Sequence, residues 1–308
     1  MTPQKFSGLT CALILSSLVS AAPLYWDGDA VAPVGGGGGA WDLTGTTWNS
    51  DPVGGPPANQ AWVNNVPPDD AVFAGVPGAV QVTAGVSAHN VTFGAGGYSL
   101  VGAGSLTLGG AAPAIDVASG LASVTAPVAG SAGLVKTGAG TLGLFGVNSF
   151  SGGLTVSDGR VLAYNNDALG AGVDVVTLDG GTLQIATPSG NAGTLYMQLG
   201  NPFGGAPPRQ IVVGPGGGTL DIPYFGGGGN GSMISGAAGL SGSGALTKTG
   251  MGYLWVTAPL DYAGDLTIGP NGHYVELRNA GALRNAASIT IQQSSSLILN
   301  NNDGLSRP

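Results

Sequence analysis

The chain has 308 residues, of which 59 are glycine and 20 are proline, and only 8% carry a charge. Its hydrophobic content of 43% excludes a disordered chain, because disordered segments are poor in apolar residues and rich in charge. Acidic residues outnumber Lys and Arg by 16 to 8. This balance excludes the basic surface that a nucleic-acid partner requires, and it argues against an anionic membrane as a partner.

The N-terminal residues 1–21 are predicted to form a secretory signal peptide. Lys5 supplies the positive end, residues 9–19 the apolar stretch, and Val19-Ser-Ala21 a cleavage site of small residues. The only cysteine, Cys11, lies inside this segment, so the mature chain would contain no disulfide and no thiol-based site. No later stretch is long and apolar enough to be a transmembrane helix. We therefore expect export without a membrane span in the mature chain.

Residues 22–75 are predicted to form a β-rich cap module that contains four of the five tryptophans. Two interpretations of these indoles stay open. They could form a platform that stacks against carbohydrate, or they could be buried as a hydrophobic lid at an open end of the fold. The four residues are Trp26, Trp41, Trp48 and Trp62.

The remainder, residues 76–308, consists of short apolar runs separated by Gly-rich turns. Apolar and small polar residues alternate in many runs, as in Leu106-Thr-Leu108, which indicates strands with one buried face. Glu276 is the only glutamate, and because residues that favour helices are scarce, long helices are not expected. This spacing of strands would also suit a β-sandwich.

An internal repeat favours a parallel β-helix over the sandwich. The segment Leu134-Val-Lys-Thr-Gly-Ala-Gly-Thr-Leu142 recurs 112 residues later as Leu246-Thr-Lys-Thr-Gly-Met-Gly-Tyr-Leu254. Stacked coils reuse such units, because one coil cannot bury its apolar face alone. We expect the two lysines to occupy the same place in each copy, on the outer face, where they would keep a sheet edge from pairing with other chains. The copies span residues 133–170 and 245–284, and their signature positions are Leu134, Lys136, Thr137, Gly138, Gly140, Leu142 and Gly152, and Leu246, Lys248, Thr249, Gly250, Gly252, Leu254 and Gly264.

The first copy, continued by Asn148-Ser-Phe-Ser-Gly-Gly-Leu-Thr-Val156 and Ala168-Leu-Gly170, closely resembles the autotransporter-associated β-strand repeat, also called the passenger-associated transport repeat. The second copy is weaker, with Met251 and Tyr253 in place of small residues. The resemblance implies a right-handed parallel β-helix, secreted or displayed by a Gram-negative-type bacterium, in which the repeat assists export and folding. Classical members end in an outer-membrane barrel. No such segment precedes Pro308, so outer-membrane association would depend on a barrel missing from this chain.

Residues that could carry catalysis or hold a metal are sparse. His89 and His273 lie in dissimilar sequences and are interpreted as turn or edge residues. The acidic pairs Asp27-Gly-Asp29 and Asp69-Asp70 could contribute to Ca²⁺ binding, but they lack the six to eight oxygen ligands that Ca²⁺ requires. Turn capping by the aspartates is favoured instead. We therefore predict no catalytic residue, no metal and no cofactor.

These observations predict a non-enzymatic, adhesin-like passenger and scaffold. Its partners would be extracellular polysaccharide or components of host or other cell surfaces. The alternative is a polysaccharide-active or carbohydrate-binding β-helix that uses Asp residues and the cap tryptophans.

Overall fold

The structure is a computed structural model. The predicted signal peptide, residues 1–21, lies outside the residues that it describes. Within the described part of the chain, no helix has the length and apolar character needed to cross a membrane. The described residues are 22–29, 34–55, 58–164, 166–171, 174–185, 198–199, 209–223, 231–234, 239–257, 259–270, 273–279 and 281–300.

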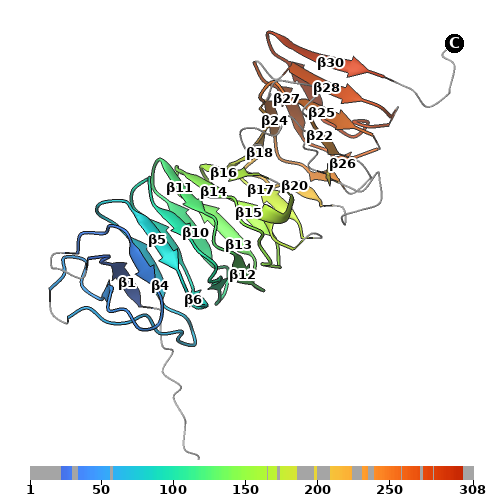
Figure 1. The fold of residues 1–308 in the computed structure, drawn as a ribbon. Coiled ribbons are helices and arrows are strands. Elements are labelled where there is room, and N and C mark those ends of the chain that lie inside the picture. Colours follow the sequence, from blue (N-terminus) through green and yellow to red (C-terminus); the bar gives the residue numbers. More distant parts are fainter. Residues whose placement is uncertain are drawn as a thin grey trace, which may run out of the picture.

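The chain winds into a three-sided coil whose strands pair in parallel with the coils before and after (Figure 1). One side is an 11-stranded sheet, called sheet I, with the order β26 (Asp261–Tyr262), β23 (Leu240–Gly242), β20 (Ile211–Val213), β17 (Val176–Leu178), β15 (Leu154–Val156), β13 (Leu134–Thr137), β10 (Ala114–Val117), β7 (Val91–Phe93), β4 (Asp70–Phe73), β1 (Pro23–Trp26), β3 (Trp48–Asn49). Only the pairing of β1 with β3 is antiparallel among the named pairs.

The second side is another 11-stranded parallel sheet, called sheet II. Its order is β2 (Gly39–Trp41), β5 (Ala79–Val82), β8 (Ser99–Val101), β11 (Leu121–Val124), β14 (Thr141–Leu144), β16 (Arg160–Ala163), β18 (Thr182–Ile185), β21 (Gly218–Asp221), β24 (Leu246–Thr249), β27 (Asp265–Ile268), β29 (Ser288–Ile291).

The third side is divided. Near the N-terminal end it is sheet III, formed by β12 (Val128–Gly130), β9 (Leu106–Leu108) and β6 (Val86–Ala88). Near the C-terminal end it is sheet IV, formed by β19 (Gln198–Leu199), β22 (Gly231–Ile234), β25 (Tyr253–Val256), β28 (His273–Leu277) and β30 (Ser295–Leu299). Between them the 3₁₀ helix η1 (Asn166–Leu169) occupies this side. The prediction of an all-β parallel β-helix is confirmed, and the sandwich, which is built of antiparallel sheets, is excluded.

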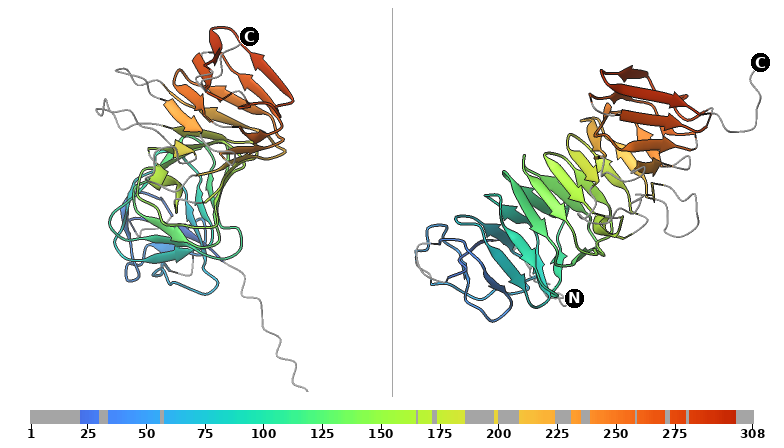
Figure 2. Two further views of the ribbon diagram at one scale, coloured as in Figure 1. Left: turned by 90° about the vertical axis from the view of Figure 1, so that its right-hand side faces the viewer. Right: turned by 45° about the horizontal axis from the view of Figure 1, so that its top comes forward.

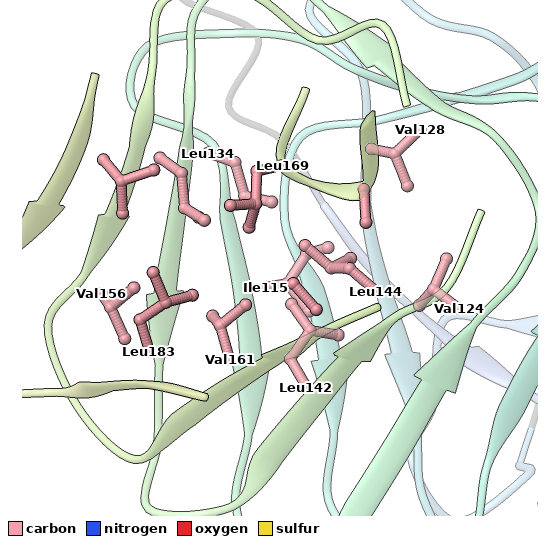
Figure 3. Close-up of a cluster of buried hydrophobic side chains, with 14 of the residues drawn as sticks. Ile115, Val124, Val128, Leu134, Leu142, Leu144, Val156, Val161, Leu169 and Leu183 are labelled. Atoms are coloured by element: carbon pink, nitrogen blue, oxygen red, sulfur yellow. The ribbon is translucent and has the colours of Figure 1, made fainter. Parts of the chain in front are cut away.

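Alternation of buried and partly exposed residues along most strands builds the core. In β7 and β15 the first and third residues are buried and the middle threonine is partly exposed. Successive coils place apolar residues above one another inside the tube, as Leu142, Val161 and Leu183 show in Figure 3. A single hydrophobic cluster runs from Leu24 to Leu283. The coils are therefore held together by one continuous apolar column.

The cap and the coil share their sheets. Strand β1 of the cap pairs with β4, which in turn pairs with β7 of the coil. Strand β29 lies toward the opposite end of the elongated body (Figure 2), and its two isoleucines, which pair with the buried Leu266 and Ile268, are exposed. Ile289 is 39% and Ile291 48% exposed. The two ends thus differ, because tryptophans cover the first and no side chain of the described residues covers the second to the same extent.

Candidate functional site

The first copy of the repeat forms a corner between sheets I and II. Strand β13 ends at Thr137, the chain turns through Gly138 and Gly140, and β14 follows. Gly138 has φ of +74°, a left-handed conformation that favours glycine. A Cβ there would lie 2.5 Å from the carbonyl oxygen of Val117 in the preceding coil. The glycine is therefore required both by the turn and by the close approach of the neighbouring coil.

Lys136 points into this corner. It pairs with Ile115 and Val156 in the adjacent coils and is 0% exposed. Its Nζ donates hydrogen bonds to the carbonyl oxygens of Thr137 at 2.5 Å and Gly138 at 2.6 Å, and it lies 3.4 Å from that of Asp158. Buried carbonyls need a partner, and the ammonium supplies it where the turn has none.

The second copy builds the same corner. Lys248 is also 0% exposed, with Leu220 and Ile268 as its partners in the adjacent coils. Its Nζ donates to the carbonyl oxygens of Gly250 and Gly252, both at 2.5 Å. The φ of Gly250 is +75°, one degree from that of its counterpart in the first copy.

The expectation that the two lysines lie on the outer face is wrong. Both ammonium groups are buried and donate hydrogen bonds to main-chain carbonyls of their own turn. Burial lowers the pKa of Lys136 and of Lys248 to about 8, while nearby aspartates act in the opposite direction. For Lys136 these are Asp116 and Asp158, and for Lys248 it is Asp221.

The two copies do not lie on the same side of the coil. The first runs from sheet I to sheet II, through β13 and β14, whereas the second runs from sheet II to sheet IV, through β24 and β25. The rotation persists downstream, because β15 and β16 lie in sheets I and II while β27 and β28 lie in sheets II and IV. The expectation that the lysines occupy one place therefore holds for the local corner but not for the side of the coil.

A third buried cation, Arg209, also donates hydrogen bonds to main-chain carbonyls. This residue was not identified from the sequence. Its guanidinium is 0% exposed and donates to the carbonyl oxygens of Leu169, Gly170 and Asp174, each at 3.0 Å. Desolvation lowers its pKa, opposed by Asp174 and Asp167. Arg209 thereby satisfies the carbonyls at the end of η1, where the chain returns to sheet I.

The downstream half of each copy differs more. In the first copy the buried Asn148 bridges three coils: its Oδ1 accepts from the N–H of Val128 at 2.8 Å, and its Nδ2 donates to the carbonyl oxygen of Ala168 at 2.6 Å. The second copy has Leu260 at this position. There a different polar contact is made, since the hydroxyl of Tyr262 accepts from the N–H of Leu246 at 3.0 Å.

The cap tryptophans pack against one another inside the first coils. All four are 0% exposed. The rings of Trp48 lie 5.2 Å from Trp26, 5.1 Å from Trp41 and 4.7 Å from Trp62 between centroids. A carbohydrate platform needs an accessible ring face, so the structure contradicts sugar stacking by Trp26, Trp41, Trp48 and Trp62. The geometry is that of the buried lid.

The acidic pairs make hydrogen bonds to residues that are distant in the sequence. Asp27 is buried and its Oδ2 accepts from Asn59 at 2.7 Å. Asp70 accepts from the main-chain N–H of Asn90 at 3.0 Å, and its Oδ1 lies 3.2 Å from Nδ1 of His89. Across the described ranges, no group of three or more His, Cys, Asp or Glu side chains is placed to hold a metal ion.

A second aromatic group, which sequence reasoning passed over, lies on the outer surface of sheet IV. Alternation along β25 buries Leu254 and Val256 and leaves Tyr253 and Trp255 partly exposed. The ring of Tyr253 lies 4.9 Å from that of Tyr274 and 5.9 Å from that of Trp255, with interplanar angles of 12° and 22°. We call Tyr253, Trp255 and Tyr274 the aromatic face.

Comparison with known proteins bears on the repeat corner first. The model of the family described as Passenger-associated-transport-repeat matches residues 134–163, which contain the first corner and the strands β13 to β16. The Adhesin BmaC autotransporter of Brucella suis biovar 1 (strain 1330) is 37% identical over 172 residues, which are 55% of this chain and 5% of that protein.

The chain thus spans a small part of the length of the relative that it matches. No solved structure matches it. The resemblance drawn from the Lys-Thr-Gly-x-Gly unit is confirmed: the chain is a parallel β-helix that carries a passenger-associated transport repeat and is similar in sequence to an autotransporter adhesin.

Proposed function

We propose that this chain is an adhesin-like, non-enzymatic passenger segment, secreted by or displayed on a Gram-negative-type bacterium. The observation that carries the proposal is the passenger-associated transport repeat at residues 134–163, together with the 37% identity to an autotransporter adhesin. Residues 1–21 would direct the first step of export. Partners would be components of other cell surfaces or extracellular polysaccharide.

The structure supports a scaffold that presents its outer surface. Its four sheets form the three sides of a long tube with a continuous apolar interior, and the buried cations donate hydrogen bonds to main-chain carbonyls. The repeat corner helps to hold this tube together, because one ammonium satisfies carbonyls that the turn leaves inside the coil. We infer that the repeat corner serves the folding of the passenger and that the outer faces of the coil contact partners.

A polysaccharide-active enzyme remains the alternative, and the adhesin relative does not favour it. One assay on the purified chain distinguishes the enzyme from the non-enzymatic passenger. The purified full chain is incubated with neutral and acidic polysaccharides, and release of reducing ends is measured. We expect no release, and release that is abolished by an Asp→Asn change would overturn the non-enzymatic proposal.

Adhesion itself is tested with beads. Fluorescent beads coated with the full chain, and beads coated with the same chain after thermal unfolding, are offered to cultured epithelial cells and to bacterial cells. We expect retention of the folded chain well above that of the unfolded chain. Equal retention on every surface would contradict an adhesin-like role.

A further inference from the structure

The aromatic face stands on the outer surface of sheet IV, with Tyr253 and Tyr274 on neighbouring strands and Trp255 two residues beyond Tyr253 on the same strand. Tyr253 in β25 pairs in register with Tyr274 in β28 on one side and with Gly231 in β22 on the other. The tyrosine in β28 stacks on it at 4.9 Å, whereas the glycine offers no side chain to cover the opposite side of the ring. The row of rings therefore ends at a position where no side chain projects from the paired residue.

Polar groups border the rings. The Arg278 guanidinium lies over the Trp255 ring, 4.8 Å from its centroid, and donates to Oε2 of Glu276 at 2.9 Å. Asn300 donates to Oε1 of the same carboxylate at 2.7 Å. These hydrogen bonds, with that of Arg278 foremost, lower the pKa of Glu276, so the group is a carboxylate in a paired arrangement. The result is an apolar ring surface rimmed by planar hydrogen-bonding groups.

Charge distinguishes this patch from the rest of the surface. The chain has 8 Lys and Arg residues, and Lys136, Arg209 and Lys248 are buried in the coil. Within the described ranges, this leaves Arg160, Arg278 and Arg284 as the cations that reach the surface, against an excess of aspartates. An anionic partner is therefore repelled by the molecule as a whole. The patch itself is neutral, because its one carboxylate and its one guanidinium neutralise each other.

We propose that the aromatic face binds an uncharged polysaccharide. The C–H faces of pyranose rings pack against indole and phenol rings, and sugar hydroxyls exchange hydrogen bonds with planar carboxylate, amide and guanidinium groups. Tyr and Trp suit this task because each has an apolar body and a polar tip, and both are rigid anchors at interfaces. The neutral rim matches a ligand without charge. This inference rests on the proposed function and assigns it a ligand class and a surface.

The test measures binding of the full chain to soluble polysaccharides by affinity electrophoresis. The neutral probes are laminarin, galactomannan and xyloglucan, and the anionic probe is polygalacturonate. We expect retardation by at least one neutral probe and none by polygalacturonate. Trp255→Ala and Tyr274→Ala should each weaken binding about tenfold or more, as loss of an anchoring aromatic residue does.

The matched control is Tyr164→Ala. Tyr164 stacks on Phe145 at 4.0 Å and is partly exposed, so its removal also takes one ring from an aromatic pair, but directly after β16 and outside sheet IV. We expect binding of this variant to equal that of the unchanged chain. Circular dichroism of all three variants shows whether each retains the β-helix, and a Trp255→Phe variant, which keeps a ring, should retain most binding.

Other outcomes overturn the inference. Absence of binding to all neutral probes, or equal loss in the Tyr164→Ala variant, would remove the glycan site. If beads adhere to cells through Trp255 and yet no polysaccharide binds, the aromatic face contacts a protein partner and the glycan inference fails while the adhesin-like function stands. If the unchanged chain binds a neutral polysaccharide but coated beads adhere to nothing, the proposed function fails and the binding site remains.

Discussion

The two copies of the repeat share one corner and differ in almost everything around it. Gly138 and Gly250 have φ values of +74° and +75°, and each copy buries its lysine against carbonyls of its own turn. Yet one corner joins sheets I and II and the other joins sheets II and IV. The Lys-Thr-Gly-x-Gly unit therefore specifies a turn together with the lysine that donates hydrogen bonds inside it. It does so whichever side of the coil the turn occupies. The position that bridges coils differs between the copies, since it is Asn148 in the first and Leu260 in the second.

The largest effect is expected from the corner glycines. Gly138→Ala places a methyl group 2.5 Å from a carbonyl oxygen of the preceding coil, and Gly250→Ala places one at 2.4 Å. Each should lower the free energy of unfolding by more than about 4 kcal/mol, or prevent folding of the local coils. Urea unfolding followed by circular dichroism gives the overall loss. Hydrogen exchange locates it, because coils contact only their neighbours.

Gly37→Ala separates the two causes of this effect. Gly37 has φ of +87°, but no heavy atom lies within 4 Å of the Cβ that alanine would add. It should cost only the strain of a left-handed alanine, about 1–2 kcal/mol. Equal costs at Gly37 and Gly138 would show that φ alone explains the glycines and that the close approach of coils is unimportant.

Removal of the buried ammonium should come next. Lys136→Met and Lys248→Met keep the apolar stem but leave the turn carbonyls without a donor. Each should lower the free energy of unfolding by about 3 kcal/mol, because an unsatisfied buried polar group costs its full desolvation. The control Arg284→Met, at an exposed cation, should change it by no more than about 0.5 kcal/mol. A gain in stability in the lysine variants would mean that desolvation of the charge outweighs its hydrogen bonds.

Alternation along the strands contained the signal for these lysines. In Leu134-Val-Lys-Thr the buried Leu134 and Lys136 are two residues apart and so share a face, as do Leu246 and Lys248. The outward placement followed from the general rule that lysine is rarely buried. The rule failed because the donors that the turn needs are inside the coil.

The same alternation places Tyr253 and Trp255 outside, opposite Leu254 and Val256, so the aromatic face was within reach of sequence reasoning. The cap tryptophans were not, because Trp26, Trp41, Trp48 and Trp62 lie at irregular spacing among loops and no strand period assigns them a face. Likewise, nothing local in the sequence brings Arg209 to the carbonyl of Leu169, forty residues earlier. The architecture followed from the repeat, and contacts between distant coils did not.

A smaller effect should distinguish the downstream halves. Asn148→Leu gives the first copy the residue that the second has at Leu260. The N–H of Val128 and the carbonyl of Ala168 then lose their partner, and the free energy of unfolding should fall by about 2 kcal/mol. Tyr262→Phe, which removes the acceptor for the N–H of Leu246 and the donor to the carbonyl oxygens of Gly244 and Asp265, should cost about 1 kcal/mol. Both are measured by urea unfolding, and a neutral Asn148→Leu would show that the bridge between coils does not stabilise the first copy.

A last expected effect is a change of stability with pH that the two copies share. Lys136 and Lys248 have a pKa of about 8 in the folded chain, below the ordinary value of 10.5. Between pH 8 and pH 10 the unfolded chain therefore binds more protons than the folded chain, and the free energy of unfolding rises with pH. Tyr98 and Tyr262 act in the opposite sense, since burial raises the pKa of each from 10.0 to about 12, so that the folded chain holds more protons above pH 10.

Urea unfolding across pH 7 to pH 11 should thus show a rise followed by a decline. A variant with both Lys136→Met and Lys248→Met should lose the rise and keep the decline, whereas Tyr98→Phe with Tyr262→Phe should do the reverse. If the rise survives in the double lysine variant, other groups cause it and the two buried ammonium groups do not titrate in this range.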